Sequence, residues 1–445
     1  MTVGGMGRVL SRWLGIGFLS AERQLGLRKN SREPAGVLII VQNLPVPFDR
    51  RVWLECQALR DAGYDVSVIC PKADGDPECQ VLDGIHLYKY RPYPPTRTKR
   101  GFVAEYTYSF VMTTWLAAKV WRRKPVDILQ TCNPPDIFWP LGLLFRLVAG
   151  ARFVFDQHDL CPELYQSRFP DGAQLPYVAL RLMELCTYRI ANHVIATNGS
   201  YRAIAMRRGR RHGNEVTVVR TGPDLNRLRR QEPDAAFRRG RRFLVCYLGV
   251  MGPQDGVEIV VRAADWIVHG LKRMDISFTL IGTGDCFPDL VALSERLNLR
   301  DYVEFTGRVP DEVVFRALST ADVGLSPDPK NPLNDVSTMN KTMEYMAFGL
   351  PVVAFDLRET RVSAGGAGVY VEPNDVRLFA EAIVELLDDE PRRLSMAAVA
   401  RSRVYQELAW HHQRALYVNV YDELLGFGPV TTNAATVDTV DTGWA

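Results

Sequence analysis

Short apolar runs alternate with helical segments along this chain, and the alternation restarts after an arginine-rich interval. The first run, residues 37–41, precedes a segment with helical spacing that stops at Gly63, and the apolar run 66–70 follows. The second series begins with residues 243–248. Strands that alternate with helices predict a mostly parallel sheet with helices on its faces. The sequence therefore predicts an α/β fold with two Rossmann-like domains.

The two series and their flanks divide the chain into six expected parts. In chain order these are a basic amphipathic segment (1–35), an N-terminal domain (36–225), an arginine-rich linker (226–242), a C-terminal domain (243–408), a helix (409–425) and a disordered tail (426–445). The tail is rich in Thr, Val and Gly, which favours disorder. A return of the last helix to the N-terminal domain is an open alternative.

Loops at the carboxyl ends of the expected strands carry the polar residues and glycines of interest. Open α/β sheets bind ligands outside these strand ends, and two such domains facing each other create a cleft. The loops that we expect to converge there are 42–49, 131–136, 156–163, 220–224, 249–256, 282–286, 306–310 and 326–341.

The segment around Glu344 predicts a helix whose first turn suits a phosphate. Asn340 can cap its start, and Gly349 followed by Pro351 ends it. Free backbone N–H groups and the positive end of the helix dipole favour an anion, and Lys341 adds a full charge beside them. The alternative is an ordinary capped surface helix with a solvated lysine and glutamate.

Composition and charge exclude several classes of protein. The net charge of the 445 residues is only +3, which gives no global support for nucleic-acid binding. The eight cysteines include no C-x-x-C pair, and no zinc spacing occurs, so reduced thiols in a cytoplasmic protein are expected. No apolar stretch reaches the ~18 residues of a membrane span.

Residues 8–29 combine aromatic and aliphatic side chains, among them Trp13 and Phe18, with basic ones. A basic amphipathic segment of this kind can lie on an anionic membrane surface, which would make the protein peripheral on the inner face of the membrane. The alternative, with equal weight, is a helix that packs on the protein's own body.

Taken together, the motifs resemble those of retaining nucleotide-sugar glycosyltransferases of the GT-B fold, specifically glycosyltransferase family 4. The resemblance covers about residues 36–425. It rests most specifically on segments 43–53, 157–159 (Gln-His-Asp), 249–256, 282–284 (Gly-Thr-Gly), 305–310 (Phe-Thr-Gly-Arg-Val-Pro) and the Glu344 helix with Gly-Leu-Pro-Val-Val after it.

The resemblance implies a donor nucleotide in the C-terminal domain. Glu344 would accept hydrogen bonds from the ribose hydroxyls, a contact that suits a carboxylate and a diol. Backbone at Arg308 and Val309 would read the base edge. The remaining implied donor contacts come from the head of the helix and from two glycine loops: Thr338, Met339, Asn340 and Lys341, with Gly249, Gly252, Gly282 and Gly284. A plain strand-to-helix turn is the alternative for residues 282–284.

Two departures from the family pattern bear on catalysis. Val336 stands eight residues before Glu344, where the family usually has a second glutamate, and Val250 and Asp255 stand where a basic pair is common. A departing diphosphate needs cationic or N–H stabilisation. We expect Lys341 to supply it, with Arg308 as a weaker candidate.

The loop after the strand 153–155 contains His158. Its functional interpretation is a donor to the transferred sugar or to the scissile phosphate oxygen, and its alternative is a loop histidine satisfied by Asp156 or Asp159. The sequence offers no covalent nucleophile, and enzymes of this family are thought to use front-face displacement. We expect no metal, because Asp74-Gly75-Asp76 lies away from the strand ends.

The first loop of the N-terminal domain is the expected acceptor side of the cleft. Asn43, Asp49, Arg50 and Arg51 are the candidates, and two adjacent arginines could grip an acceptor phosphate. Capping of the following helix by Asp49 and solvated arginines are the alternative.

The expected function is transfer of a sugar, with retention, from a nucleotide-diphosphate sugar to a glycan, lipid-linked or small-molecule acceptor of polysaccharide or cell-envelope synthesis. Two alternatives stay open: a catalytically silent nucleotide-sugar-binding subunit, favoured by the departures at Val336, Val250 and Asp255, and a nucleotide-sugar epimerase of the same architecture.

Overall fold

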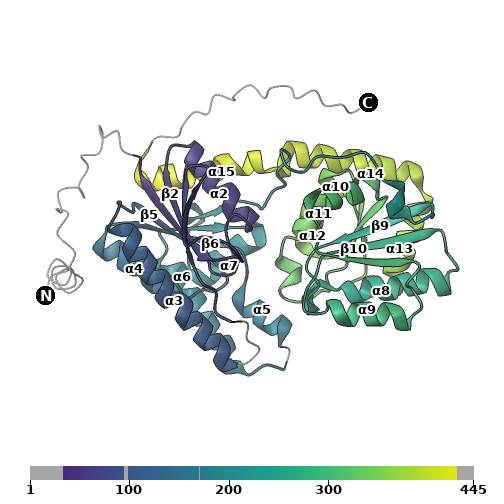
Figure 1. The fold of residues 1–445 in the computed structure, drawn as a ribbon, viewed down its shortest axis with the longest axis horizontal. Helices are drawn as coiled ribbons and strands as arrows, with labels where there is room; N and C mark the ends of the chain where they lie inside the picture. The colour runs from purple at the N-terminus through teal and green to yellow at the C-terminus, as the bar shows by residue number, and fades with distance from the viewer. Residues whose placement is uncertain (1–33, 95–98, 170, 428–445) are drawn as a thin grey trace.

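The computed structural model describes residues 34–94, 99–169 and 171–427, which form two α/β domains side by side (Figure 1). The segment predicted over residues 8–29 and positions 428–445 of the predicted tail lie outside these residues. Within the described residues, no helix has both the length and the hydropathy needed to cross a bilayer.

The N-terminal domain is built on an eight-stranded sheet in the order β3-β4-β2-β1-β5-β6-β7-β8, in which only β3 and β4 pair antiparallel. Its strands are β1 (Gly36–Ile40), β2 (Asp65–Pro71), β3 (Cys79–Leu82), β4 (Ile85–Tyr90), β5 (Ile128–Cys132), β6 (Arg152–Gln157), β7 (His193–Ala196) and β8 (Val216–Val218). Its helices are α2 (Arg50–Asp61), α3 (Lys99–Trp121), α4 (Trp139–Val148), α5 (Cys161–Arg168), α6 (Gln174–Ile190) and α7 (Gly199–Gly209).

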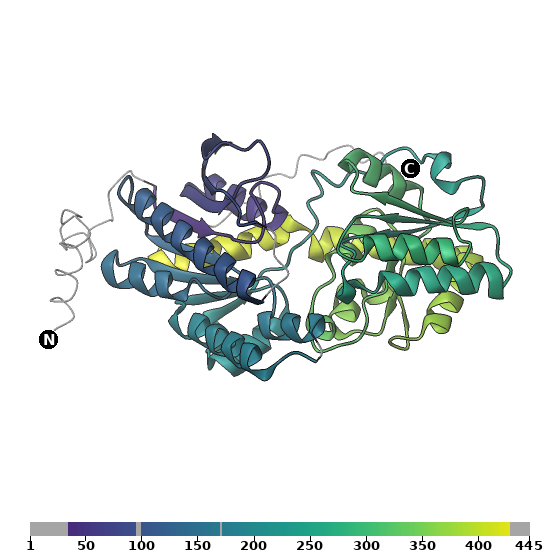
Figure 2. The same ribbon diagram turned by 60° about the horizontal axis from the view of Figure 1, so that its bottom comes forward.

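Alternate residues of the buried strands face two separate cores. Leu38 and Ile40 of β1 pack with helices α3, α4, α6 and α7, whereas Val37 and Ile39 pack with α2 and the C-terminal helix. This period-2 alternation of a strand buried on both faces explains its continuous apolar run. Helices α3, α4 and α6 therefore cover one face of the sheet together, as Figure 2 shows.

The C-terminal domain contains a six-stranded parallel sheet in the order β11-β10-β9-β12-β13-β14. Its strands are β9 (Phe243–Leu248), β10 (Ile276–Ile281), β11 (Val303–Gly307), β12 (Val323–Ser326), β13 (Val352–Phe355) and β14 (Gly368–Val371). Its helices are α8 (Val257–Asp265), α9 (Phe287–Arg296), α10 (Asp311–Thr320), α11 (Asn340–Ala347), α12 (Arg358–Ala364), α13 (Val376–Asp388) and α14 (Glu390–Arg403). The predicted fold class is confirmed.

The last helix, α15 (Trp410–Leu425), crosses back to the N-terminal domain (Figure 1). Tyr417 and Tyr421 are buried in the same core as α2, and Tyr64 donates a hydrogen bond to Asp422 at 2.5 Å. The arginine-rich interval 226–242 is held to the C-terminal domain, since Leu228 is buried there and Arg238 pairs with Asp322 at 2.7 Å.

Direct contacts join the two domains at the carboxyl ends of their strands. At the start of α7, Asn198 Nδ2 donates to Thr338 Oγ1 at 3.1 Å, and the Tyr201 hydroxyl lies 2.9 Å from Ser337 Oγ. The neighbouring Ser200 hydroxyl donates to Glu359 at 2.6 Å. The segment just before α11 is therefore positioned by the N-terminal domain.

Candidate functional site

The loop that follows β6 places His158 at the carboxyl end of the N-terminal sheet. Asn133 fixes this loop, because its side-chain oxygen accepts the backbone N–H groups of His158 and Asp159 at 2.7 and 3.1 Å. The ring Nε2 of His158 lies 2.6 Å from Asp156 Oδ2 and 3.1 Å from Arg51 Nε. Asp156 therefore orients the imidazole ring.

Arg51 lies beneath this pair. Its guanidinium donates to both carboxylate oxygens of Asp156, at 2.8 and 3.3 Å, and to the Val219 carbonyl at 2.9 Å. Burial alone would raise the pKa of Asp156, but Arg51 and His158 outweigh it, so the pKa lies below its ordinary value. Only 5% of the Arg51 side chain is exposed. The prediction that Arg51 grips an acceptor phosphate is therefore wrong: burial and its own ion pairs make it a support for His158.

A chain of buried polar contacts continues from Arg51 to helix α15. Glu55 lies 3.0 Å from Arg51 Nε and accepts a hydrogen bond from Gln130 at 2.9 Å. The Gln130 carbonyl oxygen accepts from the Tyr417 hydroxyl at 2.7 Å, and from that of Tyr421. Burial and the charge of Asp156 raise the pKa of Glu55. The C-terminal helix is thus connected through side chains to the support of His158.

Four potential metal ligands, Glu55, Cys132, Asp156 and His158, have donor atoms within 4.8 Å of one another. The Arg51 guanidinium already contacts both carboxylates. A metal cation at this point would be repelled by that buried positive charge. We therefore infer that Arg51 supplies the positive charge that faces the carboxylates of this cluster.

The head of helix α11 carries no side-chain cap. The N-cap position is Met339, and Asn340 is the first helical residue, so the prediction that Asn340 caps this helix is wrong. Lys341 Nζ lies 2.6 Å from Asp328 Oδ1 and 5.1 Å from the centre of the Tyr247 ring. Burial alone would lower the pKa of Lys341, but Asp328 and Asp255 outweigh it, which keeps the ammonium charged.

The glycine loops beside α11 pack backbone against backbone. A Cβ atom at Gly282, where φ is +133°, would lie 1.9 Å from the Gly249 carbonyl oxygen, and one at Gly284 would lie 2.7 Å from Met251 backbone atoms. Gly249 has φ of +153°, and Gly252 donates its N–H to Asp255 at 2.9 Å. These glycines are explained by the close approach of the two loops to each other.

Glu344 lies one turn inside α11, with 24% of its side chain exposed. Burial raises the pKa of its carboxyl, while Arg50 and Arg227 oppose that rise. Arg50 reaches across from α2, with Nη1 at 3.9 Å from Glu344 and Nη2 donating to Asp311 at 2.8 Å. The structure thus places Arg50 in contact with the expected donor side.

The other residues of the first loop have separate environments. Asp49 is buried and accepts the Val52 N–H at 3.2 Å, which is its alternative role as the cap of α2. The Arg308 guanidinium lies over the exposed Phe48 ring, 4.3 Å from the ring centre. Arg308 and Val309 follow directly after the end of β11. Asn43 lines a cavity.

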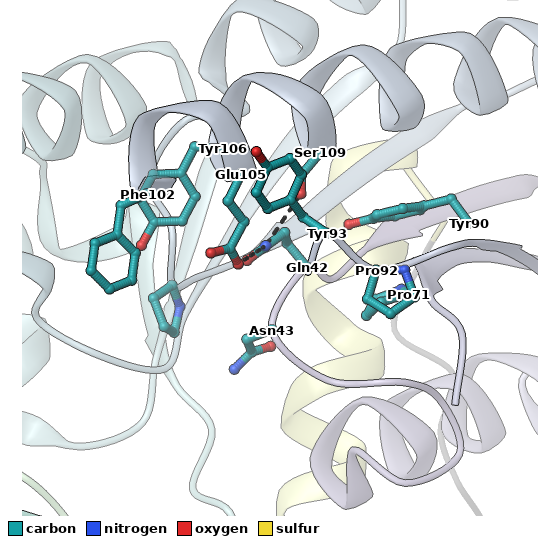
Figure 3. Close-up of a pocket in the computed structure, with 11 residues that line it drawn as sticks. Gln42, Asn43, Pro71, Tyr90, Pro92, Tyr93, Phe102, Glu105, Tyr106 and Ser109 are labelled. Atoms are coloured by element: carbon teal, nitrogen blue, oxygen red, sulfur yellow. Dashed lines mark hydrogen bonds between the residues drawn. The ribbon is translucent and has the colours of Figure 1, made fainter. Parts of the chain in front are cut away.

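That cavity, of about 260 Å³, lies between the first loop, the end of β4 and the start of α3 (Figure 3). Gln42 donates to Glu105 and to Ser109, both at 3.3 Å. Aromatic side chains form much of the wall, and the lining residues are Gln42, Asn43, Pro71, Tyr90, Pro92, Tyr93, Phe102, Glu105, Tyr106, Ser109 and Pro134. Pro134 follows Asn133, so the cavity adjoins the residue that fixes the His158 loop.

Two family models match successive parts of the chain. The model described as Glycosyltransferase Family 4 matches residues 49–227, and that described as Glycosyl transferases group 1 matches residues 242–389. The chain belongs to glycosyltransferase family 4. The two matched ranges correspond to the two domains of the structure.

Curated relatives are glycosyltransferases, and solved structures share the fold. The chain is 29% identical to the D-inositol 3-phosphate glycosyltransferase of Thermobispora bispora over 47% of this chain and 51% of that protein, about half its length. It is 29% identical to the phosphatidyl-myo-inositol mannosyltransferase of Mycolicibacterium smegmatis over 84% and 89% of the two chains. The fold matches that of a sucrose-phosphate synthase from Thermosynechococcus elongatus with a TM-score of 0.73 at 19% identity, covering 88% and 100% of the two chains. The predicted GT-B fold is confirmed.

The family 4 pattern leads to some site residues and misses others. Val336 has no carboxylate. The carboxylate of the adjacent Asp335 accepts the backbone N–H of Arg358 at 3.1 Å, at the start of helix α12. Sequence reasoning did not assign roles to Asn133, Asp328 or the aromatic wall of the cavity. Asn133 follows β5, Asp328 follows β12, and the cavity wall lies at the end of β4 and the start of α3, so position at a strand end is the signal that could have identified them.

Proposed function

We propose that this protein is a retaining glycosyltransferase that moves a sugar from a nucleotide-diphosphate sugar to an acceptor held by the N-terminal domain. The observation that carries the proposal is the buried Arg51–Asp156 ion pair beneath His158, at the strand ends that face the C-terminal domain. Strongly perturbed, buried groups that support a partly exposed histidine are typical of active sites.

The donor is proposed to bind at the head of α11. Glu344 accepts the ribose hydroxyls in place of its present contact with Arg50, and backbone at Arg308 and Val309 meets the base. The amides of Thr338, Met339, Asn340 and Lys341 hold the diphosphate, since α11 has no side-chain cap to occupy them. Lys341 adds positive charge, which its partner Asp328 fixes in place.

In the proposed reaction, the bond between the sugar anomeric carbon and the phosphate oxygen breaks as the acceptor oxygen attacks from the same face. The acceptor proton passes to the departing phosphate oxygen. His158, oriented by Asp156, donates to the sugar or to that oxygen, and Lys341 with the α11 amides stabilises the growing negative charge. No covalent intermediate on the protein is needed.

The acceptor is proposed to enter the cavity of Figure 3. Glu105 is the one charged residue of its described lining, so the site favours hydroxyl or amine groups over phosphate. Tyrosine and phenylalanine rings suit the apolar face of a polyhydroxylated ring, and Gln42, Asn43 and Ser109 suit its hydroxyls. The names of two relatives contain inositol, a polyhydroxylated ring that carries a phosphate in both names, and such a phosphate would have to lie outside this cavity.

Incubation with a panel of nucleotide sugars and cyclic polyol acceptors tests the proposal, with release of free nucleoside diphosphate as the readout. We expect one donor to give release that rises when a suitable acceptor is added. Tight nucleotide binding without release from any pair would instead support a silent binding subunit. Conversion of the donor sugar without an acceptor would support an epimerase.

Replacing Glu344 by alanine is expected to weaken binding of the donor nucleotide by about 1.5–3 kcal/mol, the range for a hydrogen bond to a charged group. Calorimetric titration measures this change. Glu312→Ala, which removes an exposed glutamate of the neighbouring helix α10, is the control and should leave the affinity unchanged. An unchanged dissociation constant in folded Glu344→Ala would contradict the assignment.

The same site predicts a pH dependence. Burial raises the pKa of Glu344 above 4.5 in the free protein, and only the ionised form accepts both ribose hydroxyls well. Nucleotide affinity should therefore fall as the pH is lowered through that raised pKa towards 4.5. Glu344→Gln should remove this part of the dependence.

A further inference from the structure

The outward faces of helices α3, α4 and α6 expose an unusual number of large apolar side chains. On α6, Leu175, Val178, Leu182 and Leu185 recur at helical spacing on one side, and 79% of Leu175 is exposed. We call the whole surface the helical face; its apolar members are Val103, Val111, Trp115, Leu143, Leu147, Leu175, Val178, Leu182 and Leu185.

The three helices that carry these side chains form one layer. The three helices share one core beneath the N-terminal sheet, and Figures 1 and 2 show them along the same side of the domain. Trp121 of α3 contacts Phe145 of α4, with ring centres 5.7 Å apart, and α4 packs against α6. Single exposed apolar residues are normal on proteins, whereas a row across three adjacent helices indicates an interaction surface.

The charge on and beside the three helices is mostly positive. The basic residues include Arg100, Lys119, Arg123, Arg181 and Arg189, of which Arg181 lies 3.7 Å from Glu184, and the exposed Asp171 precedes α6. The two carboxylates of these helices are directed elsewhere. Glu105 accepts from Gln42 in the cavity, and Glu184 is buried and paired with Arg208 at 3.0 Å. Apolar and cationic side chains together, with no exposed carboxylate on these helices, suit an anionic lipid surface.

We propose that the helical face lies on the surface of a membrane that contains anionic lipids. Its apolar side chains enter the boundary between headgroups and acyl chains, and its arginines and lysine pair with lipid phosphates. This inference differs from the predicted contact through residues 8–29, because it assigns the membrane to the folded domain.

If the helical face lies on a membrane, the acceptors of the proposed function, on which this step rests, belong to the class of lipid-anchored molecules. A groove of about 850 Å³ is lined by Trp115, Met112 and Lys119 of α3, and also by a loop that carries both Lys72 and the carboxylates Asp74 and Glu78. It shares Tyr90, Pro92 and Tyr93 with the acceptor cavity. An acceptor with its tail in the membrane can therefore reach the cavity along this groove.

Vesicle flotation with the full chain tests the membrane contact without any need for activity. The probes are phosphatidylcholine vesicles with and without phosphatidylglycerol. We expect binding that requires phosphatidylglycerol and weakens with salt, and a loss of about tenfold or more in partition for Val178→Glu/Leu182→Glu, whose positions are 57% and 59% exposed.

The matched control is Leu394→Glu/Val399→Glu, which adds the same charges at exposed apolar positions of α14 in the other domain. It should bind like the wild type. Arg123→Glu/Arg189→Glu provides a second test of the helical face should the first variant fail to fold. Absence of wild-type binding, or equal binding by the folded face variants and the control, would overturn the proposal.

Discussion

Replacing Arg51 by methionine is expected to lower the free energy of unfolding by about 3–5 kcal/mol, the range for breaking a buried ion pair. The substitution leaves Asp156 and Glu55, both fully buried, without their shared cation. Urea denaturation measures the loss. The control is Arg262→Met, which breaks an exposed pair with Glu258 of 2.6 Å and should cost less than about 1 kcal/mol.

The pH dependence of this loss follows from the sign of the pKa shift. In the wild type the pKa of Asp156 is lowered, so its stabilising contribution is present above 3.8 and is lost as the pH falls through the lowered value. Without Arg51, only His158 opposes the effect of burial, so the pKa of Asp156 should lie higher than in the wild type. The Arg51→Met variant should therefore lose less stability at mildly acidic pH than at pH above neutral. Equal losses for Arg51→Met and Arg262→Met would contradict the buried network.

Asp156→Asn is expected to lower kcat on the order of 10²-fold, with little change in the KM for the donor. The amide keeps the size of the side chain, but it cannot hold the His158 ring by a charge-assisted hydrogen bond, and small errors of position cost about this much. Steady-state kinetics of the two proteins over a range of donor concentrations measure kcat and KM separately.

A double-mutant cycle with His158→Ala separates positioning from a general loss of structure. If Asp156 acts through His158, the double variant should be no slower than His158→Ala alone. A loss of kcat in the folded double variant equal to the product of the two single losses would show that Asp156 acts independently of the histidine. An unchanged kcat in Asp156→Asn would show that Asp156 does not contribute to catalysis.

Features that depend on neighbours in sequence were predictable. The strand 243–248, the stop of α11 at Gly349, where φ is +73°, and the cap of α2 by Asp49 all follow from short-range patterns. Even so, the first turn of α11 was misjudged by one residue, because Asn340 could cap a helix but lies inside it. Helix boundaries are set by the surrounding packing as well as by local preference.

The parts that were missed depend on contacts between distant residues. Arg51 and Asp156 are 105 positions apart, and Gln130 meets Tyr417 across 287 positions, so no local pattern shows that these groups are paired. Helix α3 carries apolar side chains on both its exposed and its buried face: Val111 and Trp115 are exposed, whereas Leu116 and Val120 are buried. Its sequence therefore shows no single apolar face from which a helix could be predicted. Because α3 was not predicted, the cavity that it helps to form was not predicted either.

The measurement that tests the central proposal most directly is the identity and anomeric configuration of the product. The protein is incubated with the donor found in the panel and a cyclic polyol acceptor, and the product is examined by mass spectrometry and proton NMR. We predict an acceptor carrying one added sugar with the configuration of the donor, formed by the wild type and greatly reduced in His158→Ala. An inverted linkage, or full product formation by folded His158→Ala, would contradict front-face transfer at this site.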